Sequence, residues 1–156
     1  MIRVPAEVQR AFALPVSPEA AFALMRDVPA WGALFPNVAR ITALEEDVWQ
    51  WDMKPLGPPG FEARTVYACR YVFNAEAHEV TWTPEPGVGN ATFAGGVRFA
   101  PEASGGGTAG TLWLDAALDI PAPRFMGGIV RPAVAFEFGR MTDQFLSRLE
   151  TAVRDL

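Results

Sequence analysis

Residues 133–156 read AVAFEFGRMTDQFLSRLETAVRDL, and this segment decides the fold. Its apolar residues recur at steps of four, three, four, four and three residues, which is the period of one face of an α-helix. They are Val134, Phe138, Met141, Phe145, Leu149 and Ala152. A helix with such a face needs an apolar surface to cover it, so we expect the rest of the chain to supply one.

Most of the chain before this helix alternates between apolar and polar residues, which is typical of β-strands. Between these segments lie loops rich in proline and glycine, such as residues 56–61. Within one predicted strand, Gly95 and Gly96 indicate a bulge that would bend the sheet. The predicted strands are residues 8–14, 38–45, 47–54, 63–74, 78–82, 93–99 and 111–120.

Two short helices are predicted between the first two strands. Ser17 can cap a helix, Pro18 suits its first position, and Glu19 interacts favourably with its positive end. Residues 27–29 interrupt this helix, and residues 30–35 form a second short one that stops before a proline. The connection between the first two strands is therefore helical.

The long C-terminal helix has an irregular start in the sequence. It is expected to begin near Arg124, but Gly127, Gly128 and Pro132 predict loose or kinked first turns. The regular part is expected from Ala133 onward.

The size and charge of the chain exclude several classes of protein. Residues 1–156 are long enough for one domain with a sizeable core, and no linker or repeat divides them. Half of the residues are hydrophobic, which excludes a disordered chain. The net charge of −5 argues against a nucleic-acid partner, because phosphate binding needs clustered basic residues. The only lysine is Lys54, and the arginines are scattered.

The chain has one cysteine and one histidine, so an internal disulfide and a histidine-rich metal site are both excluded. We expect no metal and no cofactor. Residues 1–10 lack the apolar stretch of a signal peptide, and no apolar run is long enough to span a bilayer. The sequence therefore predicts a soluble cytoplasmic protein without stable membrane insertion.

Five short segments, in this order, give the chain a family resemblance. It resembles the helix-grip family, which includes START domains, Bet v 1-like proteins, and bacterial polyketide cyclases and dehydrases. The segments are Ser-Pro-Glu at 17–19, Asp-Val-Pro-Ala-Trp at 27–31, Phe-Pro-Asn-Val at 35–38, Val-Thr-Trp at 80–82, and Phe-Leu-Ser-Arg-Leu-Glu at 145–150.

The resemblance implies an α+β fold. A curved seven-stranded antiparallel sheet would wrap around a long C-terminal helix, with two short helices after the first strand. It also implies an apolar cavity between sheet and helix that holds lipids, sterols, polyketides or other hydrophobic molecules. Aromatic cavity walls would fit a quinone, a fatty acid or a polyketide equally well. The resemblance implies no particular activity, and no catalytic residue is carried over from the family.

The inward faces of the predicted elements give a set of candidate ligand-binding residues. They are mostly aromatic, and bulky rings beside small residues leave room for an apolar ligand. The alternative is that the same side chains fill an ordinary core. The candidates are Trp49, Trp51, Tyr67, Tyr71, Trp82, Phe93, Phe99, Leu114, Phe138, Met141 and Phe145, with Met53, Cys69, Val80 and Leu112 beside them.

Tyr67 and Tyr71 are the most informative candidates, because a buried phenol needs a hydrogen-bond partner. A ligand oxygen could be that partner, and so could a backbone carbonyl or a water molecule. His78 lies either at the rim of the cavity or in a solvated turn. Cys69 is predicted to be a small buried hydrophobe, because no basic residue adjoins it in sequence. Trp113 faces outward, where it either forms a homodimer patch or is covered by an arginine stem.

Arg70, Arg98 and Asp115 could together supply acid and base groups for cyclisation or dehydration. Each of them alternates with inward-facing residues, however, so all three are predicted to face water. Mobile gates for ligand exchange are predicted at residues 57–60, 84–90 and 125–130.

Three functions remain open from the sequence. The first is non-enzymatic binding or transport of a hydrophobic small molecule, which needs no acid or base. The second is a polyketide cyclase or dehydratase, which needs an ionisable group inside the cavity with a perturbed pKa. The third is an interaction module, which predicts a filled interior and an exposed apolar patch.

Overall fold

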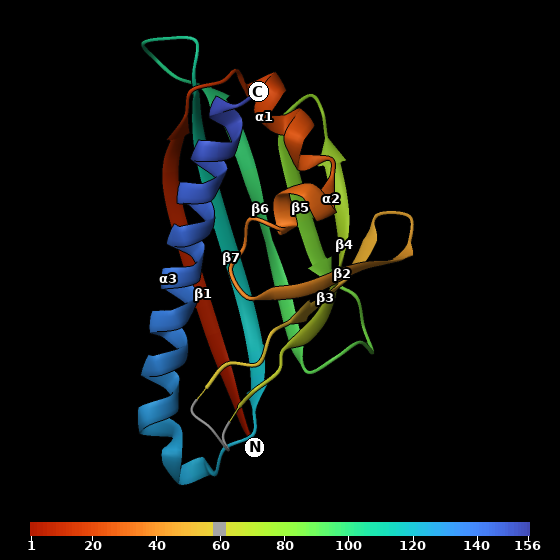
Figure 1. Cartoon of the computed structure of the whole chain (residues 1–156), viewed down its shortest axis with the longest axis vertical. Coiled ribbons are helices and arrows are strands. Elements are labelled where there is room, and N and C mark those ends of the chain that lie inside the picture. Colours follow the sequence, from red (N-terminus) through yellow and green to blue (C-terminus); the bar gives the residue numbers. More distant parts are fainter. Residues whose placement is uncertain (58–61) are drawn as a thin grey trace.

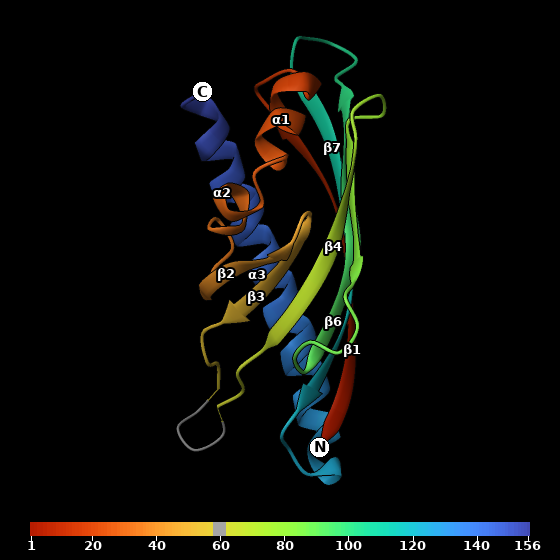
Figure 2. The same cartoon turned by 90° about the vertical axis from the view of Figure 1, so that its right-hand side faces the viewer.

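The computed structural model describes residues 1–57 and 62–156. Within these ranges, seven strands form one antiparallel sheet in the order β1-β7-β6-β5-β4-β3-β2. The three α-helices lie on one face of this curved sheet (Figures 1 and 2). The elements are β1 (Ile2–Leu14), α1 (Pro18–Met25), α2 (Val28–Gly32), β2 (Val38–Glu45), β3 (Val48–Met53), β4 (Val66–Asn74), β5 (Glu79–Pro84), β6 (Ala91–Pro101), β7 (Thr108–Ile120), the 3-10 helix η1 (Arg124–Met126) and α3 (Gly127–Arg154).

The strand β1 is longer than predicted, because it begins at Ile2 rather than at residue 8. Ile2 and Val4 continue the inward apolar face and are buried. Pro5 interrupts the sequence pattern but not the strand. Since β1 is an edge of the sheet, the missing N–H of Pro5 removes no hydrogen bond that the sheet needs.

The first short helix starts as predicted, because the Ser17 hydroxyl oxygen accepts a hydrogen bond from the amide of Ala20 at 3.2 Å. The second begins earlier than predicted, at Val28 instead of residue 30. Asp27 does not only interrupt the chain: its carboxylate accepts from the amide of Ala30 at 3.2 Å and caps α2. Pro29 fits in the first turn of that helix, where no N–H is required.

The predicted bulge at Gly95 and Gly96 was wrong. Strand β6 pairs with β5 and with β7 without any shift in register at these residues. The reason for glycine is steric, because a Cβ atom on Gly96 would collide with the indole ring of Trp113, which is half-buried. The irregular pairing lies between β2 and β3, where the register shifts near Val38 and Ala43.

Most of the other strands also differ from their predicted bounds: β5 covers Glu79–Pro84, β6 covers Ala91–Pro101 and β7 covers Thr108–Ile120. Strand β4 begins at Val66 rather than at residue 63, where a single bridge joins Leu56 to Ala63. The predicted loop at 56–61 falls largely on residues outside the described ranges. Strand β3 is shorter by one residue at each end than predicted, and β2 has the predicted bounds.

The helix α3 is regular from Gly127, so the prediction of loose turns up to residue 133 was wrong. Pro132 lies near the start of the helix, where the loss of one backbone hydrogen bond is tolerated. Phe145 and Leu149 from the predicted stripe are buried. Packing of α3 runs along β1, and Arg10 of that strand holds it through an ion pair with Asp143 at 2.7 Å.

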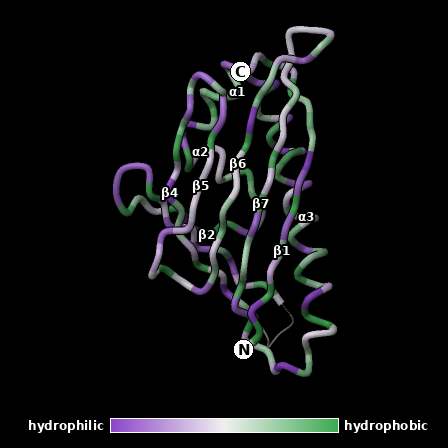
Figure 3. Tube along the Cα trace, turned by 180° about the vertical axis from the view of Figure 1, so that it is seen from behind, coloured by the Kyte–Doolittle hydropathy of each residue, from purple (hydrophilic) through white to green (hydrophobic). Residues whose placement is uncertain are grey.

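The sheet has the two-sided pattern that the sequence predicted. Along β1 and β7, buried residues alternate with more exposed ones. Figure 3 shows these strands from behind the sheet, coloured by hydropathy. The inward members form one apolar core with the helices.

Candidate ligand-binding site

The upper half of the interior, beside α1 and α2, is filled by an aromatic cluster around Trp31. Its ring centroid lies 5.5 Å from that of Trp51, 5.9 Å from that of Trp82 and 6.1 Å from that of Phe145. Only 2% of the Trp31 surface is exposed. Sequence reasoning missed Trp31 as a central residue, because a five-residue helix has too little periodicity to assign a face.

Tyr71 belongs to this cluster, and its hydroxyl accepts a hydrogen bond from Nε1 of Trp51 at 2.8 Å. Tyr67 differs, since no described residue forms a hydrogen bond with its hydroxyl. Burial raises the pKa of both phenols well above the ordinary value. Both are therefore neutral at physiological pH. The Tyr71 hydroxyl also lies within hydrogen-bonding reach of the Cys69 side chain, so Tyr67 is the phenol with a hydrogen bond to offer.

A row of aromatic rings leads from Tyr67 across the interior to α3. The Tyr67 ring stacks on Phe93 with centroids 4.0 Å apart, and Phe93 lies 5.8 Å from Phe138 of α3. Phe93 and Phe138 are only half-buried, although both pack against the core. The row thus joins the filled part of the interior to a more open part.

The solvent exposure of the interior changes along α3, from its buried C-terminal half to its more exposed N-terminal half. The buried residues of the helix are Thr142, Phe145, Leu149 and Val153, all in its C-terminal half. Val134 and Phe138, nearer its N-terminus, retain solvent exposure, as does Leu118 on the inward face of β7. We call the set Tyr67, Phe93, Leu118, Val134 and Phe138 the open wall.

The structure brings all the candidate residues to the same core. Ligand contact by each of them stays a prediction. Trp51, Tyr67, Tyr71, Trp82, Phe99, Leu114 and Phe145 are buried, whereas Trp49, Phe93, Phe138 and Met141 are half-buried.

The three candidate catalytic charges lie on the outside, as parity predicted. Arg70 is exposed and pairs with Glu45 at 2.6 Å. Arg98 pairs with Glu79 at 2.6 Å, and Asp115 is exposed on β7. None of the three is available as an acid or base toward the open wall.

His78 lies in the turn between β4 and β5, with the positive φ of 49° that such a turn requires. Its Nε2 atom is 3.8 Å from the carboxylate of Glu19, and its ring packs on Phe22 of α1. The histidine therefore belongs to the filled end of the molecule and not to the open wall.

Cys69 is buried, and its thiol donates a weak hydrogen bond to the carbonyl oxygen of Phe93 at 3.3 Å. Burial raises the pKa of this thiol to about 12. The thiolate that a nucleophile needs is therefore suppressed, and Cys69 acts as a small core residue.

A polar depression of about 460 Å³ lies beside α3, and sequence reasoning missed it. It is bounded by the segment 33–38, by Lys54, and by Arg140, Gln144 and Arg148 of the helix. Arg140, Gln144 and Arg148 follow one another at steps of four residues, and this spacing indicates that they share one side of the helix. Their proximity to Lys54 arises from the tertiary structure, and no pattern in the sequence indicates it.

The predicted gates take different forms. Residues 125–130 form η1 and the first turn of α3, with Phe125 and Ile129 strongly exposed. The 84–90 loop is tied to β4, because the side-chain oxygen of Asn90 accepts from the amide of Val66 at 2.9 Å. Residues 58–60 of the third gate lie outside the described ranges. A gating role stays a prediction for all three segments.

Among the described residues, no helix is both long enough and apolar enough to cross a membrane.

Solved structures with the same fold cover nearly the whole chain. TTHA0849 from Thermus thermophilus matches with a TM-score of 0.71 and 22% identity over 96% of this chain and 97% of its own. A START superfamily protein from Mycobacterium smegmatis has a TM-score of 0.67 and 17% identity, covering 96% and 97%. The Zhui aromatase/cyclase from a Streptomyces species has a TM-score of 0.67 and 12% identity, covering 96% and 94%.

These likenesses confirm the predicted helix-grip fold. No curated protein matches the chain. A family model does match it, over residues 5–154, and that model describes polyketide cyclases, dehydrases and lipid transport proteins. Since the match spans nearly all of the sequence, the chain belongs to the polyketide cyclase, dehydrase and lipid transport family.

Proposed function

We propose that the protein binds or carries a small hydrophobic molecule, which lies against the open wall between the sheet and the N-terminal half of α3. The main support for this proposal is that Phe93, Leu118 and Phe138 remain partly exposed to solvent, although they lie on inward faces. Apolar side chains in such positions gain about 25 cal/mol per Å² when a ligand removes them from water. Their exposure in the free protein therefore favours an apolar occupant.

The hydroxyl of Tyr67 gives the site a polar contact. The phenol of Tyr67 is neutral because burial raises its pKa, so it can donate a hydrogen bond to a ligand carbonyl or hydroxyl. The Tyr71 hydroxyl accepts from Trp51 and lies within hydrogen-bonding reach of the Cys69 side chain, so Tyr71 is engaged within the fold and would contribute shape alone. This arrangement supports a ligand that is mostly apolar with at least one oxygen.

The alternative is a polyketide cyclase or dehydratase that acts in the same place. Such an enzyme needs a base, and the inward ionisable groups identified among the described residues are Tyr67, Cys69 and Tyr71, whose raised pKa values keep them protonated. Tyr67 could still polarise a substrate carbonyl. The missing base makes binding the better-supported of the two functions.

Native mass spectrometry of the freshly purified protein tests the proposal, followed by denaturing extraction of anything bound. A stoichiometric hydrophobic molecule is expected. For protein that is purified empty, titration with the neutral fluorescent probe N-phenyl-1-naphthylamine is expected to saturate at one probe per chain. A linear, non-saturating titration of the empty protein would contradict the proposed function.

A further inference from the structure

The polar depression lies on the flank of α3 that faces away from β1. The helix packs along β1 on one side, and on the other side its residues Arg140, Gln144 and Arg148 face the segment that joins α2 to β2. Lys54 follows β3 directly and also lines the depression. Residues from three separate parts of the chain therefore meet there.

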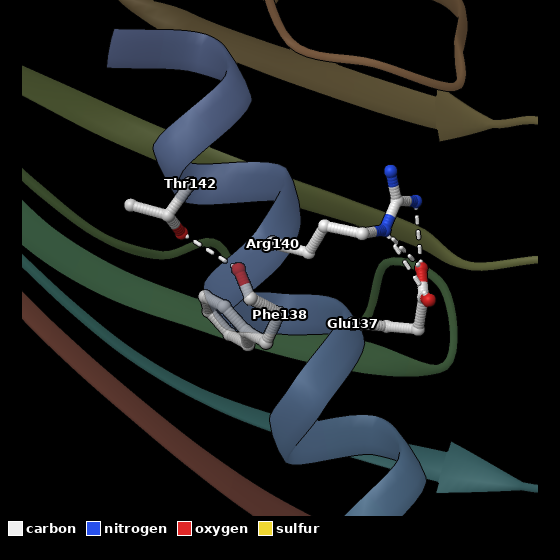
Figure 4. A network of polar contacts seen from close by, with 4 residues as sticks. All are labelled: Glu137, Phe138, Arg140 and Thr142. Carbon is white, nitrogen blue, oxygen red and sulfur yellow. Dashed lines mark hydrogen bonds and ion pairs between the residues drawn. The ribbon is translucent and has the colours of Figure 1, made fainter. Parts of the chain in front are cut away.

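The depression carries an excess of positive charge in a chain whose net charge is −5. Arg140 is paired with Glu137 at 2.7 Å, as Figure 4 shows. In the described part of the chain, no acidic side chain forms an ion pair with Lys54 or Arg148. Arg148 instead donates to the backbone oxygen of Leu34 at 3.3 Å, which holds its guanidinium at this site.

The side chain of Gln144 supplies an independent observation. Its Oε1 atom is buried and has no hydrogen-bond partner among the described residues. Buried polar atoms without partners are rare in folded proteins, and each needs an explanation. The amide can also turn by about 180° at its terminal torsion, which presents its NH₂ group as a donor. An oxygen of an anionic ligand group accepts from that NH₂ group, so such a ligand would satisfy the amide in its turned orientation.

The depression adjoins the apolar interior. Phe35 lines it, and the same ring stacks on Phe145 with centroids 4.0 Å apart and planes within 6°. On α3, Phe138 of the open wall and Arg140 of the depression are two residues apart and leave the helix on different sides (Figure 4). A ligand that bridges these two surfaces needs a polar end and an apolar body.

We infer that the depression binds the anionic head group of the ligand through Lys54 and Arg148, so the protein prefers amphipathic acids to neutral lipids. The head group is a carboxylate or a phosphate monoester, since both accept hydrogen bonds from ammonium and guanidinium groups. The apolar body lies against the open wall. This inference rests on the proposed function and adds the chemical class of the ligand.

Displacement of bound N-phenyl-1-naphthylamine separates the two claims. Decanol, decanoate and decyl phosphate have the same apolar chain and differ in the head group. Wild-type protein is expected to bind decanoate or decyl phosphate at least about tenfold more tightly than decanol, which corresponds to about 1.4 kcal/mol. Whichever of decanoate and decyl phosphate binds more tightly shows whether the preferred head group is a carboxylate or a phosphate.

The double variant Lys54→Gln with Arg148→Gln is expected to lose this tenfold preference while its affinity for decanol stays unchanged. A matched control removes two exposed arginines elsewhere, Arg64→Gln with Arg124→Gln, and is expected to keep the preference. The single variant Lys54→Gln leaves the Arg148 contact to Leu34 intact. It is expected to lose part of the preference for acids over decanol.

Equal binding of decanol and both acids by the wild-type protein would overturn the inference and leave the proposed function standing. An unchanged acid preference in the double variant would do the same. Loss of decanol binding in that variant would also overturn it, because the two residues would then support the fold instead of the head group. Absence of any saturable probe binding would overturn both claims.

Discussion

The indole Nε1 of Trp51 donates a hydrogen bond to the hydroxyl of Tyr71 at 2.8 Å, and this bond lies inside the aromatic cluster around Trp31. This hydrogen bond distinguishes Tyr71 from Tyr67, although the sequence places both phenols on the same face of one strand. Tyr71 is engaged within the fold, whereas the hydroxyl of Tyr67 has no partner among the described residues. The two tyrosines therefore have different tasks.

Replacing each tyrosine by phenylalanine separates these tasks. Tyr71→Phe leaves the buried indole N–H of Trp51 without an acceptor and is expected to lower the free energy of unfolding by about 1–3 kcal/mol. Tyr67→Phe is expected to change stability little and to weaken binding of an oxygen-bearing ligand. Urea denaturation and probe displacement measure the two effects. The reverse assignment of effects would contradict the account.

Trp31 is expected to be one of the main stabilising residues of the filled half. Trp31→Ala removes the ring that contacts Trp51, Trp82 and Phe145, and leaves its space unfilled. We expect a loss of about 3–5 kcal/mol in the free energy of unfolding, measured by urea denaturation. Trp49→Ala is the matched control, because Trp49 is only half-buried. Equal losses for the two variants would contradict the central place of Trp31.

The buried thiol of Cys69 gives a pH dependence with a defined sign. Its pKa in the folded protein is about 12, above the ordinary cysteine value of 9.0, so the unfolded chain loses this proton first as the pH rises. Between those two values the folded state binds more protons than the unfolded state, and stability falls with rising pH by up to about 1.4 kcal/mol per unit. Cys69→Ala is expected to flatten this decline in urea denaturation from pH 9 to 11. An identical decline in the variant would show that the thiol does not contribute.

The fold was predictable from the sequence because its signals are local and repeated. The stripe through Phe138, Phe145 and Leu149 identified α3, and alternation identified every strand of the sheet. Two of the errors lie beside prolines whose missing N–H the fold tolerates. Pro5 is harmless at a sheet edge, and Pro132 is harmless near a helix start.

The candidate site was less predictable, for a physical reason. Parity separates inward from outward side chains, and it placed Tyr67 and Arg70 correctly. Parity does not say how far along a helix the packing closes, which is what distinguishes Phe138 from Phe145. Nor does it show that Lys54 meets the flank of α3, because that contact joins residues far apart in the chain.

The central claim is that an apolar ligand occupies the space beside the open wall, and one pair of substitutions tests it. Val134→Trp adds a large ring to the half-buried inward face of α3, whereas Phe136→Trp places the same tryptophan side chain at a residue of this helix that is 70% exposed. Both variants are titrated with N-phenyl-1-naphthylamine beside the wild-type protein. We predict that Val134→Trp weakens binding at least about tenfold, equivalent to about 1.4 kcal/mol, and that Phe136→Trp leaves it unchanged. Equal affinity in all three proteins would contradict the account.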